Sequence, residues 1–345
     1  MRLRLACLGF GNVGRALVTM LAEKERDLRE RYDLEVCYTG AFTRSAGGWS
    51  APEGITPAAL AASGWPTSGA LPAGAQPFAG DALAFAATCP ADALIEITTL
   101  NPQSGLPAID HVRAALNAGR HVVTANKGPI AYAYRELRAL AAEHGVALRF
   151  ESTVMDGTPI FSMSEASLPA TRIEGFRGPM NGTSNYVLGR MARGESLEEA
   201  VAGAQKIGIA EADPSNDLEG WDAAVKATVV ANVLMGADLR PGDVVRDGLG
   251  AEAMRQAHAA LPPGHALKQL AVVERDGDAV RARVELAALP LSNVFATLVP
   301  GETALLLHTD TMRDLTLIEG DGGPGQTAFG IVADLVNIAR GRWTV

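Results

Sequence analysis

The sequence has few cysteines and no excess of positive charge. Its three cysteines, Cys7, Cys37 and Cys89, form no CxxC pair and no cluster with histidine, so neither a disulfide framework nor a zinc site is predicted. The 30 lysines and arginines are outnumbered by 39 aspartates and glutamates, and the net charge of -9 argues against binding to nucleic acid or anionic lipid. A small molecule is therefore the expected ligand.

The chain also lacks long apolar runs. No window reaches the roughly 18 apolar residues that a membrane-spanning helix needs, and the apolar run at the start is too short for a secretory signal. We therefore expect a cytoplasmic protein without a membrane anchor. With 345 residues, 48% of them hydrophobic, the chain is long enough for two folded domains.

The first 150 residues alternate buried strands with amphipathic helices. The pattern predicts helices at 12–31, 105–118 and up to residue 144, and strands at 3–9, 34–42, 93–98, 121–125 and 146–152. This alternation predicts an α/β fold, with a Rossmann-type doubly wound parallel sheet forming a dinucleotide-binding domain over residues 1–150. Residues 45–80 are rich in proline and glycine and are expected to be mostly loop or irregular helix.

Residues 151–325 predict a second domain of the α+β class. Helices are expected at 184–193, 197–207 and 217–235, and a mostly antiparallel sheet at 171–177, 266–274, 279–286, 303–308 and 315–318. We assign this domain to substrate binding and dimerisation, because a second copy can cover the exposed edge of such a sheet. A homodimer is expected. The closing helix, 326–341, is expected to pack back on the first domain.

A glycine-rich segment follows the first strand and opens a helix. It has the GxGxxG spacing of a dinucleotide-binding turn and comprises Gly9, Phe10, Gly11, Asn12, Val13 and Gly14. Its glycines allow a tight turn, close approach of a pyrophosphate, and packing of the helix on the strand. The second strand ends without the acid that usually binds a ribose 2′-hydroxyl, and Arg44 follows it. NADP is therefore favoured over NAD, with a solvated loop arginine as the alternative.

An acidic segment, EADPSNDLEGWDAAVK at 211–226, precedes a long apolar helix. Asp222 and Lys226 are four residues apart and share one helical face above a buried stripe. We place Asp217 at or near the N-cap of this helix, where its carboxylate can cap amides or face a ligand. An ordinary solvated salt bridge between Asp222 and Lys226 is the alternative interpretation.

Two predicted turns between a strand and a helix carry further polar residues. Lys127, in VVTANKGP, follows the carboxyl end of a parallel strand, where open α/β sheets bind ligands. Gly182 and Thr183, in GPMNGTSNY, precede a helix whose amides can hold a carboxylate. A loop lysine and a plain helix cap are the alternatives.

Taken together, these segments resemble homoserine dehydrogenase, which interconverts homoserine and aspartate 4-semialdehyde with a nicotinamide cofactor. The resemblance covers nearly the whole chain through the blocks GFGNVG, VVTANKGPIA, ESTVMDGTPIF, GPMNGTSNYVL, GIAEADPSNDLEGWDAAVK and QTAFGIVADLVNIA. It implies a reversible NAD(P)-dependent step in threonine, methionine and isoleucine biosynthesis. The glycine stretch at 322–325 is shorter than is typical of the family. Since the sequence ends at Val345, we expect no C-terminal regulatory domain.

The resemblance also implies roles for matched residues. Lys226 would be the proton donor and acceptor, with Asp222 beside it, and Lys127 would contact both substrate and cofactor. This assignment agrees with the chemistry, because a carbonyl that becomes an alkoxide requires a positive donor aimed at its oxygen. Glu211 and Asp217 would hold the substrate through its amino group.

The remaining implied contacts involve main-chain groups and a cation. Gly182 and Thr183 would contact the carboxylate of the amino acid, and Thr98 would lie against the nicotinamide. A monovalent cation, sodium by expectation, would bind to Glu151 and to main-chain oxygens of the residues that follow it, Val154, Asp156 and Thr158.

Two other functions remain open. A different semialdehyde or amino-acid dehydrogenase is one; the type that forms a thiohemiacetal requires a reactive cysteine, and all three cysteines lie in or beside predicted strands. A non-catalytic nucleotide-binding sensor is the other, since a fold alone does not prove chemistry. The presence of several candidate reacting groups disfavours the sensor.

Overall fold

The computed structural model describes residues 1–63, 71–320 and 322–341. The chain forms two compact units. Unit 1 comprises Met1–Ser162 and Gly323–Val345, and unit 2 comprises Met163–Gly322. Residues 64–70 of the segment expected to be loop, and the last four residues of the chain, lie outside the described residues. Within the described residues, no helix combines the length and the apolar character needed to cross a membrane.

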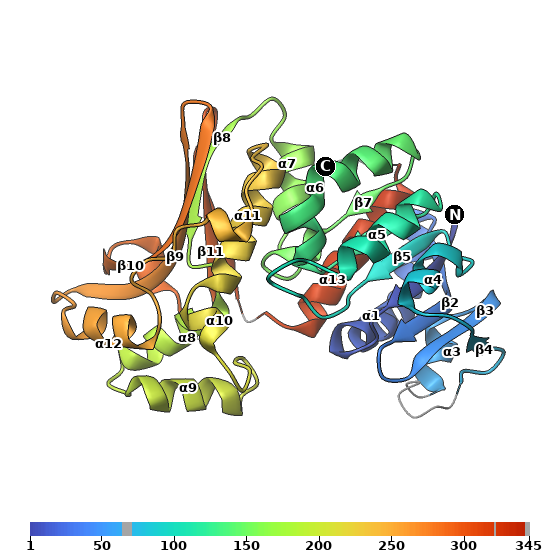
Figure 1. Ribbon diagram of the computed structural model, residues 1–345, viewed down its shortest axis with the longest axis horizontal. Coiled ribbons are helices and arrows are strands. Elements are labelled where there is room, and N and C mark those ends of the chain that lie inside the picture. Colours follow the sequence, from blue (N-terminus) through green and yellow to red (C-terminus); the bar gives the residue numbers. More distant parts are fainter. Residues whose placement is uncertain (64–70, 321, 342–345) are drawn as a thin grey trace. The chain divides into compact units, whose positions relative to one another are not determined.

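Unit 1 is built on a seven-stranded sheet with the order β4-β3-β2-β1-β5-β6-β7 (Figure 1). The strands are β1 (Arg2–Leu8), β2 (Glu35–Thr43), β3 (Gly47–Ile55), β4 (Gln76–Phe78), β5 (Ala93–Glu96), β6 (His121–Thr124) and β7 (Leu148–Arg149). The five strands β1, β2, β5, β6 and β7 run parallel, as the alternating pattern predicts. The Rossmann-type sheet is thus confirmed.

The prediction that residues 45–80 are mostly loop is wrong for β3 and β4. Both strands extend the sheet antiparallel to β2. Trp49, Ala51 and Ile55 of β3 are buried in the core of unit 1. Pro52 is tolerated because the pairing between β2 and β3 is interrupted between Ser50 and Ile55, so no ladder bond requires its missing N–H. A short helix, α3 (Pro57–Ala62), follows.

Helices cover both faces of this sheet. They are α1 (Asn12–Glu23), α2 (Glu25–Tyr32), α4 (Ala82–Thr88), α5 (Ala108–Asn117), α6 (Lys127–Glu143) and α13 (Pro324–Ala339), with the 3-10 turn η1 (Glu151–Thr153). Leu3, Leu5 and Cys7 share one core cluster with α1 and α13, whereas the alternate residues Ala6 and Leu8 are buried on the opposite face. The closing helix α13 packs against α1 (Figure 1).

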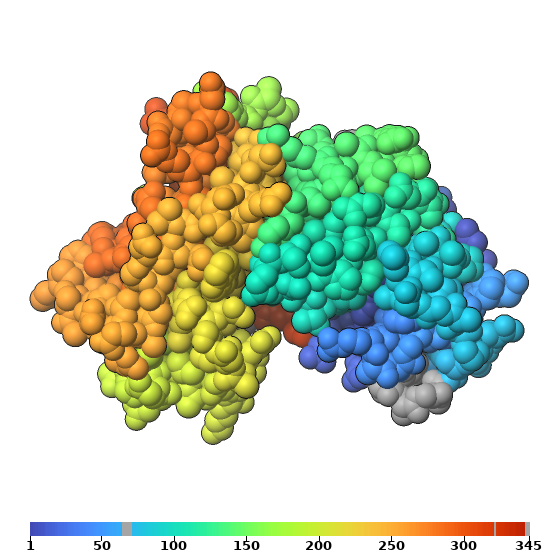
Figure 2. Space-filling model, in the orientation of Figure 1, coloured from blue at the N-terminus to red at the C-terminus, as the bar shows by residue number. Residues whose placement is uncertain are grey.

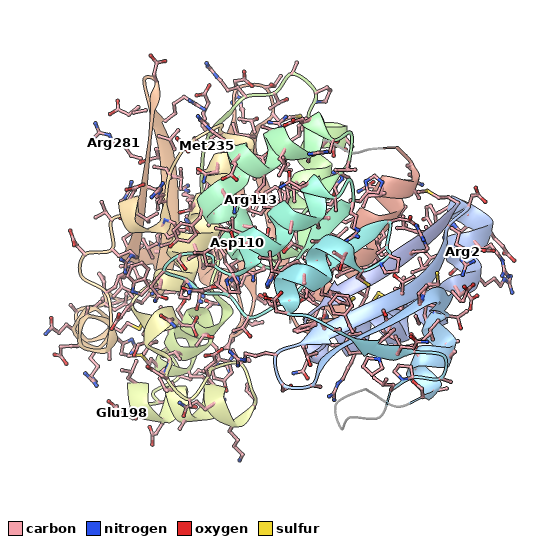
Figure 3. The ribbon with its side chains drawn as sticks, turned by 45° about the vertical axis from the view of Figure 1, so that its right-hand side comes forward. Arg2, Asp110, Arg113, Glu198, Met235 and Arg281 are labelled. Carbon is pink, nitrogen blue, oxygen red and sulfur yellow. The ribbon has the colours of Figure 1, made fainter. Side chains whose placement is uncertain are left out.

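The second face carries α4, α5 and α6, and α5 contacts both α4 and α6. Arg113 of α5 joins two of these helices at the surface: its Nη1 lies 2.6 Å from Oδ1 of Asp110, and its Nε lies 2.6 Å from Oε1 of Glu136 on α6 (Figure 3). Exposed ion pairs of this kind add little stability, so the buried apolar residues hold the layer in place.

Unit 2 contains a five-stranded sheet with the order β10-β9-β8-β11-β12. The strands are β8 (Ile173–Gly178), β9 (His265–Asp276), β10 (Ala279–Pro290), β11 (Thr303–Thr309) and β12 (Arg313–Glu319), and every neighbouring pair is antiparallel. The helices are α8 (Gly182–Met191), α9 (Leu197–Lys206), α10 (Ser215–Leu218), α11 (Trp221–Leu234) and α12 (Ala251–Ala259); α7 (Ile160–Ser167) enters the unit. Both α8 and α11 pack on β9. The predicted antiparallel sheet is confirmed.

Candidate active site

The glycine loop lies at the carboxyl end of β1. Gly9 has a φ of +89°, and a Cβ built there would lie 2.5 Å from the main-chain oxygen of Ile97, so no other residue fits. Gly11 is the N-cap of α1, and a Cβ there would meet no atom within 4 Å, which leaves room for a ligand. No side chain caps α1, and its first turn, with Asn12, Val13 and Gly14, holds no acid. This helix end suits a phosphate group.

Phe10 and Arg44, both predicted to contact the cofactor, differ in their exposure to solvent. Phe10 is buried in the core of unit 1. Arg44 lies in the exposed turn between β2 and β3, and β2 ends in Phe42 and Thr43 without an acid. The end of β2 therefore carries an exposed cation, Arg44, and no acid among its last two residues.

The carboxyl ends of β5 and β6 carry a buried network around Glu96. This fully buried carboxylate accepts hydrogen bonds from the main-chain N–H and the hydroxyl of Thr98, and from the hydroxyl of Thr124 at 3.3 Å. The side chain of Asn126 donates to the main-chain oxygen of Thr98 (3.1 Å) and caps α6 by accepting from the N–H of Gly128 (3.0 Å). Glu96 and Asn126 were not predicted as site residues from the sequence; the available signal was an acid inside the buried strand ALIE.

Lys127 is the first residue of α6 and follows Asn126 directly. Its position at the carboxyl end of β6 agrees with the sequence pattern. The Asn126 side chain therefore connects the start of α6, which carries Lys127, to Thr98 after β5. Thr98 and Lys127, both predicted to contact the cofactor, therefore lie at the same hydrogen-bonded edge of the sheet.

The predicted cation residues form a compact turn before α7. Glu151 is buried, and its carboxylate accepts hydrogen bonds from the N–H groups of Phe161 and Ser162 at 2.8 Å each. Burial raises the pKa of Glu151, and the groups that oppose this are hydrogen-bond donors, not a positive side chain. Asp156, with a φ of +47°, bends the chain between Val154 and Thr158.

The side chain of Asp156 has its own partners. One carboxylate oxygen accepts from the N–H of Gly323 (2.7 Å), and the other accepts from the hydroxyl of Thr327 (3.0 Å). These bonds attach the turn to the start of α13. Because the Asp156 side chain is engaged in them, the candidate cation ligands besides Glu151 are the main-chain oxygens of Val154, Asp156 and Thr158. A buried carboxylate held by main-chain N–H donors is a suitable type of ligand for a monovalent cation.

In unit 2, the predicted pair forms on α11. The Lys226 Nζ lies 2.8 Å from Oδ2 of Asp222, and it donates to the main-chain oxygen of Met180 at 2.7 Å. The side chains are 14% and 20% exposed, so this is not a solvated surface pair. An ammonium held in a partly desolvated position is suited to stabilise a developing oxyanion.

Asp217 is half-buried beside this pair. Its Oδ1 accepts a hydrogen bond of 2.7 Å from the side chain of Asn181. Burial raises the pKa of Asp217, the charge of Asp222 raises it further, and hydrogen bonds from Asn181 and Thr183 together with the charge of Lys226 lower it. The structure thus brings Asp217, Asp222 and Lys226 together.

Asp217 was predicted to lie at or near the N-cap of the long helix; it lies near that N-cap but does not occupy it. Asp217 lies within the short α10, and the N-cap of α11 is Gly220, with a φ of 76°. A Cβ at Gly220 would lie 2.7 Å from the Cδ1 atom of Leu249, so this turn requires glycine. The side chain of Gln269 on β9 donates to the main-chain oxygens of Asp217 and Leu218, each at 3.2 Å, and holds α10 in place.

Gly182 and Thr183 form the first turn of α8, whose N-cap is Asn181. The hydroxyl of Thr183 donates to the main-chain oxygen of Ile209 at 3.2 Å. The segment that follows α9, coloured yellow-green to yellow, lies at the surface in Figure 2. Glu211 is exposed and lies in the loop after α9. In the part of the chain that the structure describes, no hydrogen bond or ion pair joins its carboxylate to Asp217, Asp222 or Lys226.

The cysteines do not support thiol chemistry. Cys7, Cys37 and Cys89 are buried. Burial raises the pKa of Cys89 to about 11, and it raises the pKa of Cys7 even further. A nucleophilic cysteine requires the opposite shift, so the alternative that depends on a thiohemiacetal is disfavoured.

Comparison with known proteins gives the same result along the whole chain. Residues 9–151 match the family model described as homoserine dehydrogenase, NAD binding domain, and residues 159–336 match the model described as homoserine dehydrogenase. The NAD(+)-dependent homoserine dehydrogenase of Pseudomonas canavaninivorans is 35% identical over 338 residues, covering 97% of this chain and 96% of that protein.

Further relatives agree. The homoserine dehydrogenase of Sulfurisphaera tokodaii is 31% identical over 339 residues, covering 98% of this chain and 99% of that one. Among solved structures, a hyperthermophilic archaeal homoserine dehydrogenase in complex with NADPH superposes with a TM-score of 0.81 at 26% identity, covering 98% of this chain and 97% of that chain. The resemblance seen in the sequence motifs is confirmed.

Proposed function

The chain belongs to the homoserine dehydrogenase family of NAD(P)-dependent oxidoreductases, and from this premise we propose that unit 2 carries the acid–base and substrate-binding groups while unit 1 binds the cofactor. The family interconverts homoserine and aspartate 4-semialdehyde on the route to threonine and methionine. A bound nicotinamide supplies or accepts the hydride. The chain's own residues then bind and orient the substrate and move its proton.

Lys226 is the proposed proton donor and acceptor, and its geometry is the single observation that carries this assignment. During reduction the carbonyl oxygen gains negative charge, and a nearby ammonium both stabilises that charge and supplies a proton. In the reverse direction the neutral amine accepts the proton of the hydroxyl. Asp222, at 2.8 Å, and the Met180 oxygen, at 2.7 Å, hold the Lys226 Nζ in one position.

The other end of the substrate is a zwitterionic amino acid, which requires groups of both signs. Asp217 is the carboxylate of the cluster best placed to pair with the amino group, because it is half-buried next to Asp222 and Lys226. Glu211 is proposed as a second partner from its exposed loop. The amides of Gly182 and Thr183 at the start of α8 offer an N-terminal helix end to the substrate carboxylate.

The cofactor is proposed to bind through its pyrophosphate at Gly9, Gly11 and Gly14, with Thr98 and Lys127 near the nicotinamide end. NADP is proposed as the preferred form because the exposed Arg44 follows β2 where an acid is absent. The relative from Pseudomonas canavaninivorans is named as NAD(+)-dependent, so the alternative to be tested is NAD.

The remaining proposals concern the cation, the assembly and the compartment. We propose that sodium binds at the buried Glu151 with the main-chain oxygens of Val154, Asp156 and Thr158. We propose a homodimer formed through unit 2, where exposed apolar residues such as Met312 and Ile318 border the edge strand β12. A cytoplasmic location is proposed because the three cysteines are free thiols, as in a reducing compartment. The absence of a nucleic-acid partner is proposed on the acidic net charge of -9.

The function is tested by a steady-state assay with L-homoserine and either nicotinamide cofactor, run in both directions. We expect oxidation of homoserine and reduction of aspartate 4-semialdehyde, with no turnover of serine, whose hydroxyl lies one carbon closer to the amino group. Turnover of serine at a similar rate would favour another amino-acid dehydrogenase. Cofactor binding without turnover of any of these compounds would favour the sensor.

A further inference from the structure

Asn181 occupies a central position among the charged side chains of unit 2. Its side-chain Nδ2 donates to Oδ1 of Asp217 at 2.7 Å and to Oδ2 of Asp222 at 2.9 Å. Asn181 is only 3% exposed, and it is the N-cap of α8, whereas the two carboxylates belong to α10 and α11. One amide group therefore connects the first turns of three helices.

The orientation of this amide is fixed by its other end. The Asn181 Oδ1 accepts a hydrogen bond from the N–H of Ser184 at 2.7 Å, as an N-cap does. The reverse orientation would present a carbonyl oxygen to two carboxylates and an NH₂ to an N–H donor, losing all three bonds. The cap of α8 thus directs both amide protons of Asn181 at Asp217 and Asp222.

The contact matters because the two carboxylates are close to each other. The charge of Asp222 raises the pKa of Asp217, in the same direction as burial, and the hydrogen bond from Asn181 lowers it. The charged groups facing this amide are Asp217, Asp222 and Lys226, while β9 contributes the uncharged Gln269. Without a shared donor, one of two adjacent carboxyl groups tends to take up a proton.

We propose that Asn181 is a positioning residue for the reaction: it holds the carboxylates of Asp217 and Asp222 side by side and ionised next to Lys226. This inference rests on the proposed function of Asp217, Asp222 and Lys226, and it adds Asn181, which has no role in that proposal. It predicts that the Nδ2 group of Asn181 keeps Asp217 and Asp222 ionised. Its Oδ1 has a separate role, because it caps α8.

Two substitutions separate these properties. Asn181→Asp keeps the shape and the capping oxygen but replaces the donor with a third carboxylate, and Asn181→Ser keeps a hydroxyl cap without an amide. The measurement is the pH profile of kcat/KM for semialdehyde reduction. Lys226 must carry its proton in this direction, so its deprotonation lowers activity only at high pH. The loss of activity at low pH, the acid limb, therefore reports protonation of the carboxylates. A carboxyl group with a raised pKa loses its charge at a higher pH, so activity is lost at a higher pH.

For Asn181→Asp we expect the acid limb to move up by about one pH unit, so that kcat/KM measured on that limb falls by up to about 10-fold. The shift in Asn181→Ser should be smaller and in the same direction. The affinity for the reduced cofactor, measured by its fluorescence, should not change. If Asn181→Asp does not fold, Asn181→Ser carries the same test, because its hydroxyl retains the cap.

Asn185 offers a matched control on the same helix. It is equally buried, but its Nδ2 donates to the main-chain oxygens of Val299 (2.9 Å) and Glu302 (2.8 Å), and its Oδ1 accepts from Lys268 at 2.6 Å. Asn185→Asp should alter the melting temperature without moving the acid limb, because no carboxylate of the cluster contacts it.

The outcomes are distinguishable. An unmoved acid limb in both Asn181 variants, or an equal shift in Asn185→Asp, would overturn the role of Asn181 and leave the role of Lys226 intact. Full turnover in Lys226→Ala would instead overturn the proposed function itself, whatever the Asn181 variants do.

Discussion

The two functional halves of the chain are constructed differently. In unit 1 the predicted cofactor site depends on main-chain geometry: a glycine with a φ of +89° and the uncapped N-terminus of α1. In unit 2 the polar cluster depends on side chains from three helices, joined by the amide of Asn181 and by the ion pair of Lys226 with Asp222. Changes of shape should therefore impair the first half, and changes of charge should impair the second.

Apart from replacement of Lys226 itself, the largest loss of activity is expected for Asp222→Asn. The side chain keeps its size but loses the charge that holds the Lys226 ammonium, so kcat/KM for homoserine should fall about 100-fold. Cofactor affinity, measured separately by fluorescence titration, should stay the same. A loss of cofactor affinity as large as the loss of kcat/KM would mean that the two halves do not act separately.

Gly9→Ala should impair unit 1 through shape. A Cβ at Gly9 would lie 2.5 Å from the oxygen of Ile97 in a left-handed backbone, so we expect a lower melting temperature and about 20-fold weaker cofactor binding. Gly11→Ala is the matched control, because a Cβ there meets no protein atom within 4 Å.

Gly11→Ala should therefore leave the melting temperature unchanged and weaken only the binding of the cofactor. If Gly11→Ala bound the cofactor normally, the pyrophosphate would not approach the protein at this position. Equal losses of stability in the two variants would contradict the difference seen in their surroundings.

The smallest effect is expected for Arg44→Ala. Arg44 is exposed, and one charge-assisted contact with a 2′-phosphate corresponds to about a 5-fold loss of kcat/KM for NADP with no change for NAD. Parallel kinetics with the two cofactors give the ratio directly. An unchanged ratio would mean that Arg44 is a solvated loop residue, as the alternative interpretation holds.

Local sequence patterns predicted most of the fold and one side-chain contact of the candidate site. The GxGxxG spacing placed Gly9 to Gly14 correctly at the end of β1, and the spacing of four between Asp222 and Lys226 predicted their contact. Both depend on residues close together in the chain, whose relative positions are set by a single element.

What could not be predicted depends on distant segments. β3 was missed because its glycines and Pro52 resemble a loop, and only the pairing with β2 makes the strand. The break at Gly220 was missed because it depends on the nearby Leu249. Asn181 was read as part of a turn, since its bonds to Asp217 and Asp222 require α10 and α11 to be folded around it.

The central claim is that the Lys226 ammonium performs proton transfer, and Lys226→Ala tests it most directly. Turnover and cofactor affinity should be measured on the same preparation, with Lys206→Ala, an exposed lysine at the end of α9, as the control. We predict that kcat falls about 1000-fold in Lys226→Ala while cofactor affinity and the Lys206→Ala variant stay unchanged. A kcat for Lys226→Ala within about twofold of that of the unchanged protein would contradict the account.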